Sequence, residues 1–236
     1  MMNNKVIAII PARGGSKRIP NKNIKSFAGQ PIISYSIKAA QSSDLFDRIV
    51  VSTDSEKIAE VAKSCGAEVP FIRPTELADD FTGTVPVLLH ALDWLNEHNF
   101  AADYFCCIYA TAPFLQPEFI KRGFDLLKKK EATTAFSVTT FSYPIFRALK
   151  IGEDDRVEMF WPEHENSRSN DLPEAYHDAG QFYWGNTKRF LTEKKLFSSD
   201  SVPVILPRYL VQDIDTPEDW ETAEKMYSVL QMNKVK

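Results

Sequence analysis

The feature that most constrains the fold is an alternation between short apolar runs and longer amphipathic segments. Residues 5–10 are almost wholly apolar and end at Pro11, which is typical of a strand buried on both faces of a parallel sheet. Residues 55–65 instead repeat their apolar side chains at helical spacing. The same patterns predict strands over 48–52, 68–72, 104–109, 134–140 and 209–213, and helices over 32–42, 85–98, 118–130 and from 216 onward. Such alternation predicts a three-layer α/β fold with a mostly parallel sheet.

Residues 141–186 interrupt this alternation with prolines, charges and many aromatic side chains. We interpret them as an insertion that projects from a single domain, formed by residues 1–236, and returns to it. Aromatic side chains exposed on such a projection indicate a dimer contact or a substrate lid. A satellite core beneath a long loop explains the pattern equally well.

Charge is distributed very unevenly along the chain. Residues 1–43 contain seven basic residues and no Asp or Glu, although the formal net charge of the protein is −4. A basic first segment in an acidic protein indicates an anionic partner for that segment, whereas the overall charge argues against a nucleic-acid partner. A solvated basic face is the simpler alternative.

The loop that follows the first predicted strand, residues 11–18, concentrates this charge around Gly14 and Gly15. Paired glycines let the backbone approach an anion, and Arg13, Lys17 and Arg18 surround them. The loop has neither the Gly-Lys-Ser/Thr ending of a Walker A loop nor the G-x-G-x-x-G pattern. It therefore predicts a polyphosphate site, against the alternative of a glycine turn with basic residues facing solvent.

Residues 9–23 closely resemble the signature of the acylneuraminate cytidylyltransferase family, and Lys22-Asn23 distinguishes them from the related KDO enzymes. Three more blocks follow in the family's order, at 52–54, 73–80 and 212–219. The resemblance implies a Rossmann-like nucleotidyltransferase fold that binds CTP. It implies nucleotide contacts for Ala12, Arg13, Gly14, Ser16, Lys22, Asn23, Arg73, Asp80 and Thr82. Among these, Arg13 and Lys22 would be catalytic, stabilising the phosphates and the departing pyrophosphate.

Asp213 and Asp215 form an acidic pair near the C-terminus. In an extended segment, residues two apart point to the same side, and two adjacent carboxylates favour a bound cation. Beside a polyphosphate, the pair predicts a catalytic Mg²⁺ site. The simpler alternative is that Asp215 belongs to the helix start at Thr216-Pro217 and that Asp213 is a surface acid.

The family's reaction is attack by a sugar's anomeric hydroxyl on the α-phosphorus of CTP, with release of pyrophosphate. The family's sialic-acid enzymes carry Gln-Pro-Thr-Ser-Pro and Asn-Gly at the sugar site, where this chain has residues 109–113 and Ala179-Gly180. Residues 167–172 and 174–185 instead look like the pseudaminic acid cytidylyltransferase branch. That likeness implies pseudaminic acid as the acidic sugar, activated for surface glycan biosynthesis. It implies sugar contacts for Tyr109, Arg168, Gln181 and Tyr183, with Arg147 as second choice to Arg168 for the carboxylate.

Two other functions stay open at this point. The sugar is another nonulosonic acid, such as legionaminic or N-acetylneuraminic acid, or the chain is a nucleotide-binding scaffold without turnover. Residues suited to a general base are not identified, and His177 qualifies by type alone. The resemblance implies a homodimer joined through the aromatic insertion. The short N-terminal apolar run, the lack of a membrane-length apolar stretch and three cysteines without metal spacing predict a cytoplasmic protein with no membrane partner.

Overall fold

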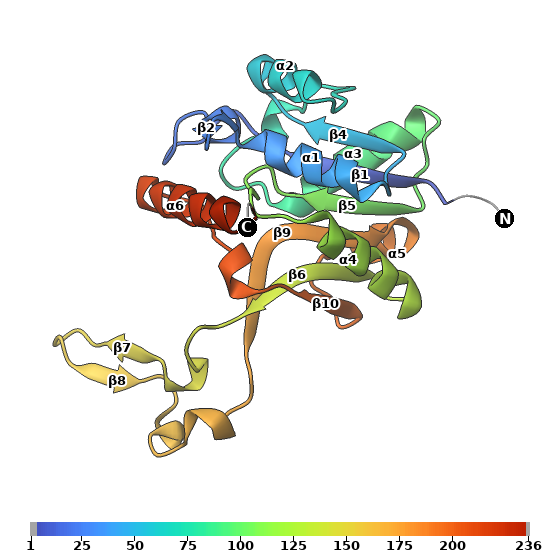
Figure 1. Ribbon diagram of the computed structural model, residues 1–236. Coiled ribbons are helices and arrows are strands. Elements are labelled where there is room, and N and C mark those ends of the chain that lie inside the picture. Colours follow the sequence, from blue (N-terminus) through green and yellow to red (C-terminus); the bar gives the residue numbers. More distant parts are fainter. Residues whose placement is uncertain (1–3, 235–236) are drawn as a thin grey trace.

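A six-stranded sheet forms the centre of the protein, as seen in the computed structural model, which describes residues 4–234 (Figure 1). Its strands lie in the order β10-β6-β9-β5-β1-β4. Their bounds are β1 Val6–Pro11, β4 Arg48–Ser52, β5 Tyr104–Ile108, β6 Thr134–Thr140, β9 Tyr176–Asn186 and β10 Ser201–Ile205. All neighbours pair in parallel except β9, which runs antiparallel to both β5 and β6. The predicted mostly parallel sheet is confirmed.

Helices cover both faces of this sheet and complete the three predicted layers. Buried side chains of α1 (Ile33–Ser43), α2 (Glu56–Ser64) and α4 (Pro117–Lys129) pack on one face. Those of α3 (Thr84–Glu97) and α5 (Thr187–Glu193) pack on the other. Alternate residues of β1 contribute to the two cores, Ile7 and Ile9 to one, and Ala8 and Ile10 to the other. This double burial explains why the strand is apolar throughout.

A third core joins the C-terminal helix to the segment after β1. Trp220 of α6 (Pro217–Lys234) packs edge-on against Phe27, and Phe114 contacts the same ring. Phe27 belongs to a small hairpin of β2 (Ser26–Phe27) and β3 (Gln30–Pro31). This packing brings residues 213–219 beside the loop of residues 11–18, which we call the basic loop. The ion pair between Arg18 and Asp215 joins the two segments, although about 200 residues separate them in sequence. Within residues 4–234, every helix falls short of the length and apolarity that crossing a bilayer requires.

Two predicted strands are absent. The segment 68–72 makes a single bridge, between Glu68 and Val50, because Pro70 follows and the chain turns away from the sheet edge. The segment 209–213 is a 3₁₀ turn (Arg208–Leu210) followed by coil, because Pro207 sets the turn and Leu210 enters the third core. The sheet instead gains β9 and β10, which were not predicted.

The projection seen in the structure has a different end from the insertion predicted over residues 141–186. Residues 141–175 leave the body as an arm that ends in a hairpin of β7 (Leu149–Ile151) and β8 (Val157–Met159) (Figure 1). The arm also carries three 3₁₀ turns, at Ile145–Arg147, Pro162–His164 and Ser169–Asp171. From Tyr176 onward the chain is β9, and Phe182, Tyr183 and Trp184 are buried in the central sheet. These three aromatic residues therefore belong to the core of the protein and not to the projecting arm.

Close packing near the C-terminal end of β9 depends on Gly185. A methyl group added there would lie 2.4 Å from ring atoms of Phe105 on the neighbouring strand. We expect Gly185→Ala to lower the free energy of unfolding by about 1–3 kcal/mol through overpacking. Gly15→Ala is the control, because nothing lies within 4 Å of its added methyl group. Urea unfolding measures both, and equal effects would contradict this account of the sheet centre.

Candidate active site

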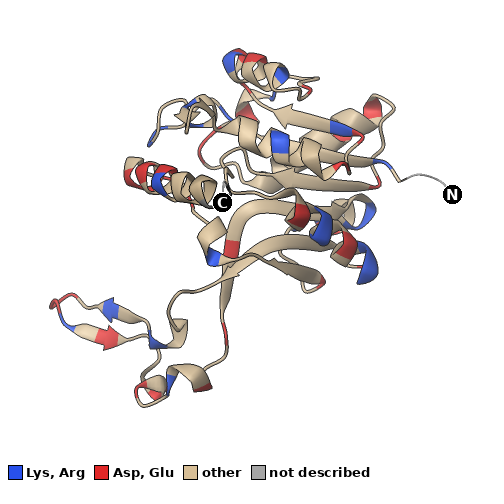
Figure 2. Cartoon of the chain, in the orientation of Figure 1, with Lys and Arg blue, Asp and Glu red and all other residues tan. Residues whose placement is uncertain are grey.

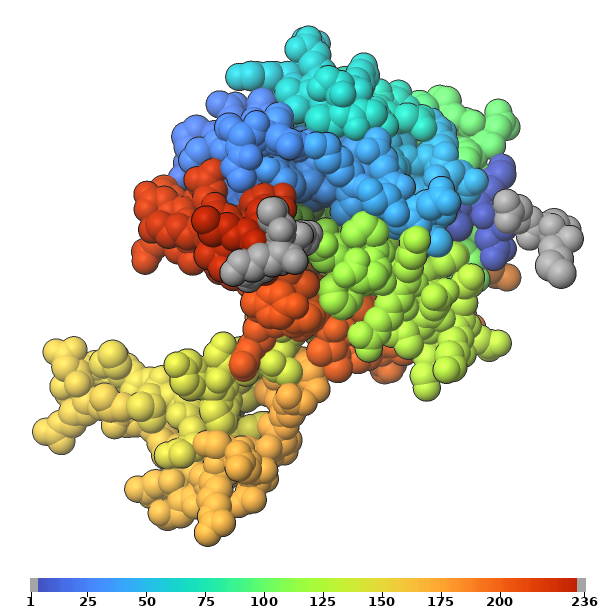
Figure 3. All heavy atoms as spheres, in the orientation of Figure 1, coloured from blue at the N-terminus to red at the C-terminus, as the bar shows by residue number. Residues whose placement is uncertain are grey.

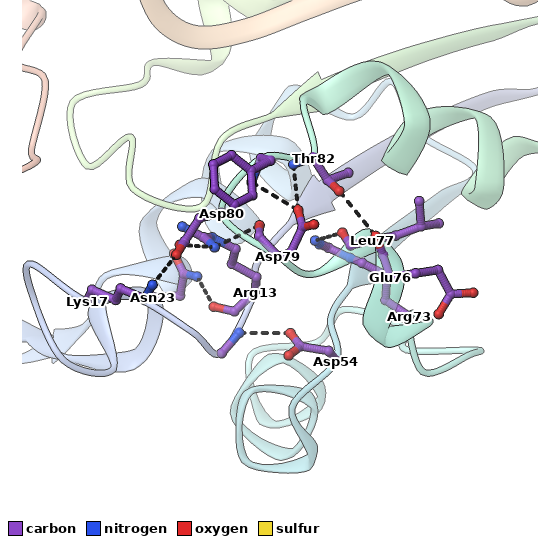
Figure 4. Close-up of polar contacts among 12 residues, drawn as sticks. Arg13, Lys17, Asn23, Asp54, Arg73, Glu76, Leu77, Asp79, Asp80 and Thr82 are labelled. Atoms are coloured by element: carbon purple, nitrogen blue, oxygen red, sulfur yellow. Dashed lines mark hydrogen bonds and ion pairs between the residues drawn. The ribbon is translucent and has the colours of Figure 1, made fainter.

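The basic loop lies at the carboxyl end of β1, and neighbouring segments hold its backbone (Figure 4). The Ala12 amide donates to the Ser52 carbonyl at 2.9 Å, so Ala12 extends the pairing with β4 and is buried. The Gly14 amide donates to Asp54 Oδ1 at 2.8 Å. Asn23 is buried and its Nδ2 donates to the Arg13 carbonyl at 2.9 Å. Asn23 therefore helps to fix the conformation of the loop. It also lines the cavity that the loop borders.

Two aspartates from distant parts of the chain gather the cations. Asp80 receives Arg13 Nη1 on one oxygen at 2.7 Å and Lys17 Nζ on the other at 2.5 Å. Asp215 receives Arg18 Nη2 at 2.7 Å and Lys22 Nζ at 3.2 Å. Hydrogen bonds from Lys17 and then Arg13 lower the pKa of Asp80 below its ordinary value. The two aspartates thus hold four cations near one another.

Arg73 is a buried anchor between β4 and the loop that carries Asp80. Its Nε donates to Ser52 Oγ at 3.1 Å, its Nη2 donates to the Ser52 carbonyl, and its Nη1 donates to the Leu77 carbonyl at 3.4 Å. Leu77 ends the 3₁₀ turn Thr75–Leu77. Burial lowers the pKa of Arg73 to about 10, which leaves it charged at neutral pH. Arg73 therefore supports the loop that carries Asp80, besides contributing charge.

The segment after this turn is shaped by Asp79. Its Oδ1 accepts from the amides of Phe81 at 3.0 Å and Thr82 at 2.6 Å, as in an Asx turn. The Thr82 hydroxyl donates to the Glu76 carbonyl at 3.2 Å. Figure 4 shows the turn next to Arg13, which also donates to the Asp79 carbonyl at 2.8 Å. Asp79 was not among the predicted site residues. The sequence signal that could have revealed it is an Asp placed two and three residues before the backbone amides of a turn, which is the pattern of an Asx turn.

These elements enclose a cavity of about 270 Å³. Its lining unites eight of the predicted site residues, namely Arg13, Ser16, Lys22, Asn23, Arg73, Thr82, Tyr109 and Asp215. Asp80 pairs with the lining residue Arg13, and Lys17 pairs with Asp80, although neither Asp80 nor Lys17 is itself part of the lining. A larger cavity, of about 440 Å³, lies where β1 and β5 begin, and its described lining holds two aspartates and a single lysine. The smaller cavity is therefore the better anion site.

The acidic pair lies in the coil between the turn at Arg208–Leu210 and α6. The N-terminus of α6 pins it, because Asp219 Oδ2 accepts from the Asp215 amide at 3.0 Å and the Thr216 amide at 2.7 Å. The Asp219 amide returns a bond to the Thr216 hydroxyl at 3.2 Å, as in a capping box. Partial desolvation and then the charge of Asp215 raise the pKa of Asp213. A carboxylate destabilised in this way favours a nearby cation.

The described residues contain no cluster of three or more His, Cys, Asp or Glu side chains arranged to hold a metal. A site built on Asp213 and Asp215 therefore needs oxygen ligands from water or from a phosphate. Mg²⁺ is the ion that commonly binds through one or two carboxylates together with substrate phosphates. The two aspartates fit that ion and not one that requires a protein cage.

The predicted sugar residues separate into three groups. Tyr109 lines the cavity, and its hydroxyl lies 2.9 Å from the hydroxyl of Thr84, which the sequence did not single out. Gln181 and Tyr183 are buried behind this wall, where Gln181 Nε2 donates to the Leu210 carbonyl at 2.5 Å and the Tyr183 hydroxyl donates to Asp178. Neither residue lines the cavity, and the polar groups of both side chains are bonded within the protein, so their contact with the sugar stays a prediction.

Arg147 and Arg168 form the third group and do not join the site of their own chain. Both are exposed on the arm, at the turns Ile145–Arg147 and Ser169–Asp171, and neither lines the cavity. Figure 3 shows the arm standing away from the body. A role for these arginines at a cavity requires that another copy of the chain supply that cavity.

Taken together, the fold and the site define a nucleotide-binding α/β protein. Ligands of such sheets bind at the carboxyl ends of the strands. That edge is where this protein concentrates its cations.

Comparison with known proteins gives a more specific assignment. A family model described as cytidylyltransferase matches residues 7–232. The pseudaminic acid cytidylyltransferase of Campylobacter jejuni is 46% identical over 225 residues, covering 95% of this chain and 97% of the relative. The CMP-N,N'-diacetyllegionaminic acid synthase of Legionella pneumophila is 32% identical, covering 96% and 98%. The chain therefore belongs to the cytidylyltransferase family.

A solved structure supports the fold independently. The structure of CMP:2-keto-3-deoxy-manno-octonic acid synthetase complexed with CTP has a TM-score of 0.69, covering 95% of this chain and 99% of that one. At 16% sequence identity this likeness concerns the fold alone. It confirms the predicted nucleotidyltransferase architecture.

Arg73 offers a test of how the site is supported. We expect Arg73→Met to lower the free energy of unfolding by about 2–4 kcal/mol, because the Ser52 and Leu77 carbonyls lose their buried donor. Arg48→Met is the control, since Arg48 pairs with the exposed Glu68 at the sheet edge and such pairs contribute under about 1 kcal/mol. Urea unfolding measures both variants. Similar losses would show that Arg73 is not a buried anchor.

Proposed function

We propose that the protein transfers CMP from CTP to the anomeric hydroxyl of pseudaminic acid, producing CMP-pseudaminic acid and pyrophosphate. The observation that carries the proposal is the convergence of Arg13, Lys17, Arg18 and Lys22 at the carboxyl end of β1. The choice of sugar is supported by the similarity to the Campylobacter jejuni relative over nearly the full length of both chains. Activated pseudaminic acid would then supply surface glycan biosynthesis, in keeping with the predicted cytoplasmic location.

In the proposed reaction, the sugar's anomeric oxygen forms a bond to the α-phosphorus as its proton passes to water. The bond between the α-phosphorus and the bridging oxygen breaks, and the electron pair stays on pyrophosphate. Fixed cations stabilise the charge that develops on that leaving group. Arg13 and Lys22 are suited to this role because each is held by an aspartate that a phosphate oxygen can replace. Asn23 and Arg73 would keep the loop and the wall in place during the exchange.

We also propose that Asp213 and Asp215 hold Mg²⁺ together with the nucleotide phosphates. Mg²⁺ supplies Lewis-acid stabilisation of phosphate charge. Asp215 would exchange part of its pairing with Arg18 and Lys22 for the ion. Because the pKa of Asp213 is raised, this carboxyl takes up a proton at a higher pH than an ordinary aspartate. Mg²⁺ affinity would therefore fall on the acid side as the pH drops through that pKa.

Pyrophosphate release from CTP, Mg²⁺ and a panel of nonulosonic acids tests the proposal. We expect release with pseudaminic acid, loss of release with EDTA, and an approximately hundredfold lower kcat for Asp213→Asn. Glu218→Gln is the matched control, because Glu218 is an exposed acid in the same region. Release with legionaminic or N-acetylneuraminic acid alone would keep the mechanism and overturn the sugar. No release with any sugar, from protein that binds CTP, would favour a non-catalytic scaffold.

The arm supports a second proposal, that the protein is a homodimer whose arms complete the sugar sites. Leu149, Ile151 and Val157 of the hairpin are 60%, 74% and 61% exposed. A lone two-stranded hairpin is marginally stable in water, so these apolar side chains need a covering surface. Both charge signs also occur along the hairpin (Figure 2), where Lys150 and Glu158 pair at 3.0 Å. In the dimer, Arg168, or Arg147 as second choice, would bind the sugar carboxylate at the other subunit's cavity.

Subunit mixing tests this arrangement. We expect Arg168→Ala and Asp213→Asn proteins each to have little activity, and their mixture, after subunit exchange, to regain about a quarter of wild-type activity. Half of the dimers are then mixed, and each pairs one intact body with one intact arm. Mixing Arg168→Ala protein with the Arg168→Ala/Asp213→Asn double variant is the control and should restore nothing. A mixture no more active than its components would place Arg168 outside the site.

A further inference from the structure

Asp178 is an exposed carboxylate on β9 that neither the nucleotide site nor the proposed metal site uses. Its Oδ1 accepts from the Gly180 amide at 2.9 Å, and its Oδ2 accepts from the Tyr183 hydroxyl. Gly180 has a φ of 60°, a left-handed conformation that glycine adopts at little cost. The carboxylate is thus fixed in direction while one side of it remains open to solvent.

A β-bulge produces this orientation. The register between β6 and β9 shifts from Phe136–Tyr183 to Val138–Asp178, so Ser137 faces several residues of β9. The Ser137 hydroxyl accepts from the amides of Gln181 at 3.3 Å and Phe182 at 3.2 Å, which satisfies the irregular backbone. Bulges next to active sites commonly redirect one side chain. Asp178 is the last residue of β9 that pairs with β6 before this shift.

Asp178 is linked to the cavity through two tyrosines that pack against each other. The Tyr183 ring packs against the Tyr109 ring with centroids 5.2 Å apart, and the Tyr109 hydroxyl contacts Thr84 at 2.9 Å. Tyr109 and Thr84 both line the cavity. Because the Tyr183 hydroxyl bonds to Asp178 and the Tyr183 ring packs on Tyr109, a single side chain separates the carboxylate from the cavity wall. Asp178 therefore lies beside the part of the cavity wall that Tyr109 forms and Tyr183 supports, which we call the tyrosine wall. The cations of the cavity come instead from the basic loop and from Arg73.

The negative charge of Asp178 limits which groups of a ligand this side chain can bind. The cations of the cavity suit the phosphates and carboxylate of the substrates, whereas an ionised carboxylate repels those groups and accepts N–H donors. An ionised carboxylate offers about four lone-pair sites, and the internal bonds of Asp178 use two of them. Pseudaminic acid, the sugar in the proposed function, carries two acylamino groups, each with an N–H donor.

We infer that Asp178 accepts the N–H of an acylamino group of the sugar and thereby determines which nonulosonic acid the site accepts. The inference rests on the proposed function. Repulsion between Asp178 and the sugar carboxylate would turn the carboxylate away from the tyrosine wall. Asp178 is thus a specificity residue, held in place by Gly180 and Tyr183.

Steady-state kinetics of Asp178→Asn with pseudaminic acid and CTP test the inference. We expect the KM for the sugar to rise about tenfold or more, because a charged acceptor is lost, while the KM for CTP changes less than about twofold. Tyr183→Phe keeps the ring and removes the bond to Asp178, so it should give a smaller rise. Asp125→Asn is the matched control, because Asp125 is an exposed acid on α4. Circular dichroism and thermal unfolding check that each variant folds.

The outcomes separate this inference from the proposed function. If wild-type protein releases no pyrophosphate with pseudaminic acid, the proposed function fails before any variant is compared. If wild type is active and Asp178→Asn keeps its sugar KM, the inference alone is wrong. A fall in kcat at an unchanged sugar KM would also overturn it, since Asp178 would then act on the chemical step. A rise in Tyr183→Phe equal to that in Asp178→Asn would reduce Asp178 to a support for Tyr183.

Discussion

The arrangement of the site depends on the pairing of four neighbouring cations with two distant aspartates. Arg13, Lys17, Arg18 and Lys22 lie within ten residues and repel one another. Asp80 and Asp215 offset that repulsion by bringing in two further segments of the chain. Exposed ion pairs of this kind contribute little stability individually. They are therefore well suited to exchange, because a polyphosphate can take over the cations at low cost while the loop keeps its shape.

Interactions that are not part of this exchange hold the surrounding frame. Arg73 is buried and bonded to backbone carbonyls on both sides of the wall. Asp219 and Thr216 bond each other's backbone at the start of α6, which fixes the segment carrying Asp215. Asn23 holds the loop itself. The ligand-responsive charges thus lie on a backbone whose polar groups are already satisfied, so replacing one anion by another need not rearrange the fold.

Strand β9 connects the parts of the molecule that have different roles. Its first residues leave the arm, its bulge directs Asp178, and its second half lies between β5 and β6 at the centre of the sheet. Tyr183 on this strand packs against Tyr109 on the cavity wall. A partner surface bound to the arm and a sugar bound at the tyrosine wall would therefore both contact segments that are joined by the single strand β9. The antiparallel direction of β9 makes this possible, since it brings the arm to the edge of the sheet where ligands bind.

The sequence by itself determined the α/β class, most helices and the strands of the parallel part, because each of these follows from a local apolar period or cap. It also determined the anion loop and most of the cavity lining, since these residues lie in short blocks that carry recognisable signatures. Only the tertiary structure decided that Gln181 and Tyr183 do not line the cavity, that Arg147 and Arg168 lie away from the cavity of their own chain, and that Asp178 is exposed next to Tyr183. Those placements depend on β9 pairing antiparallel between two strands with a bulge. A pairing partner and its register are long-range properties that no local pattern within the segment specifies.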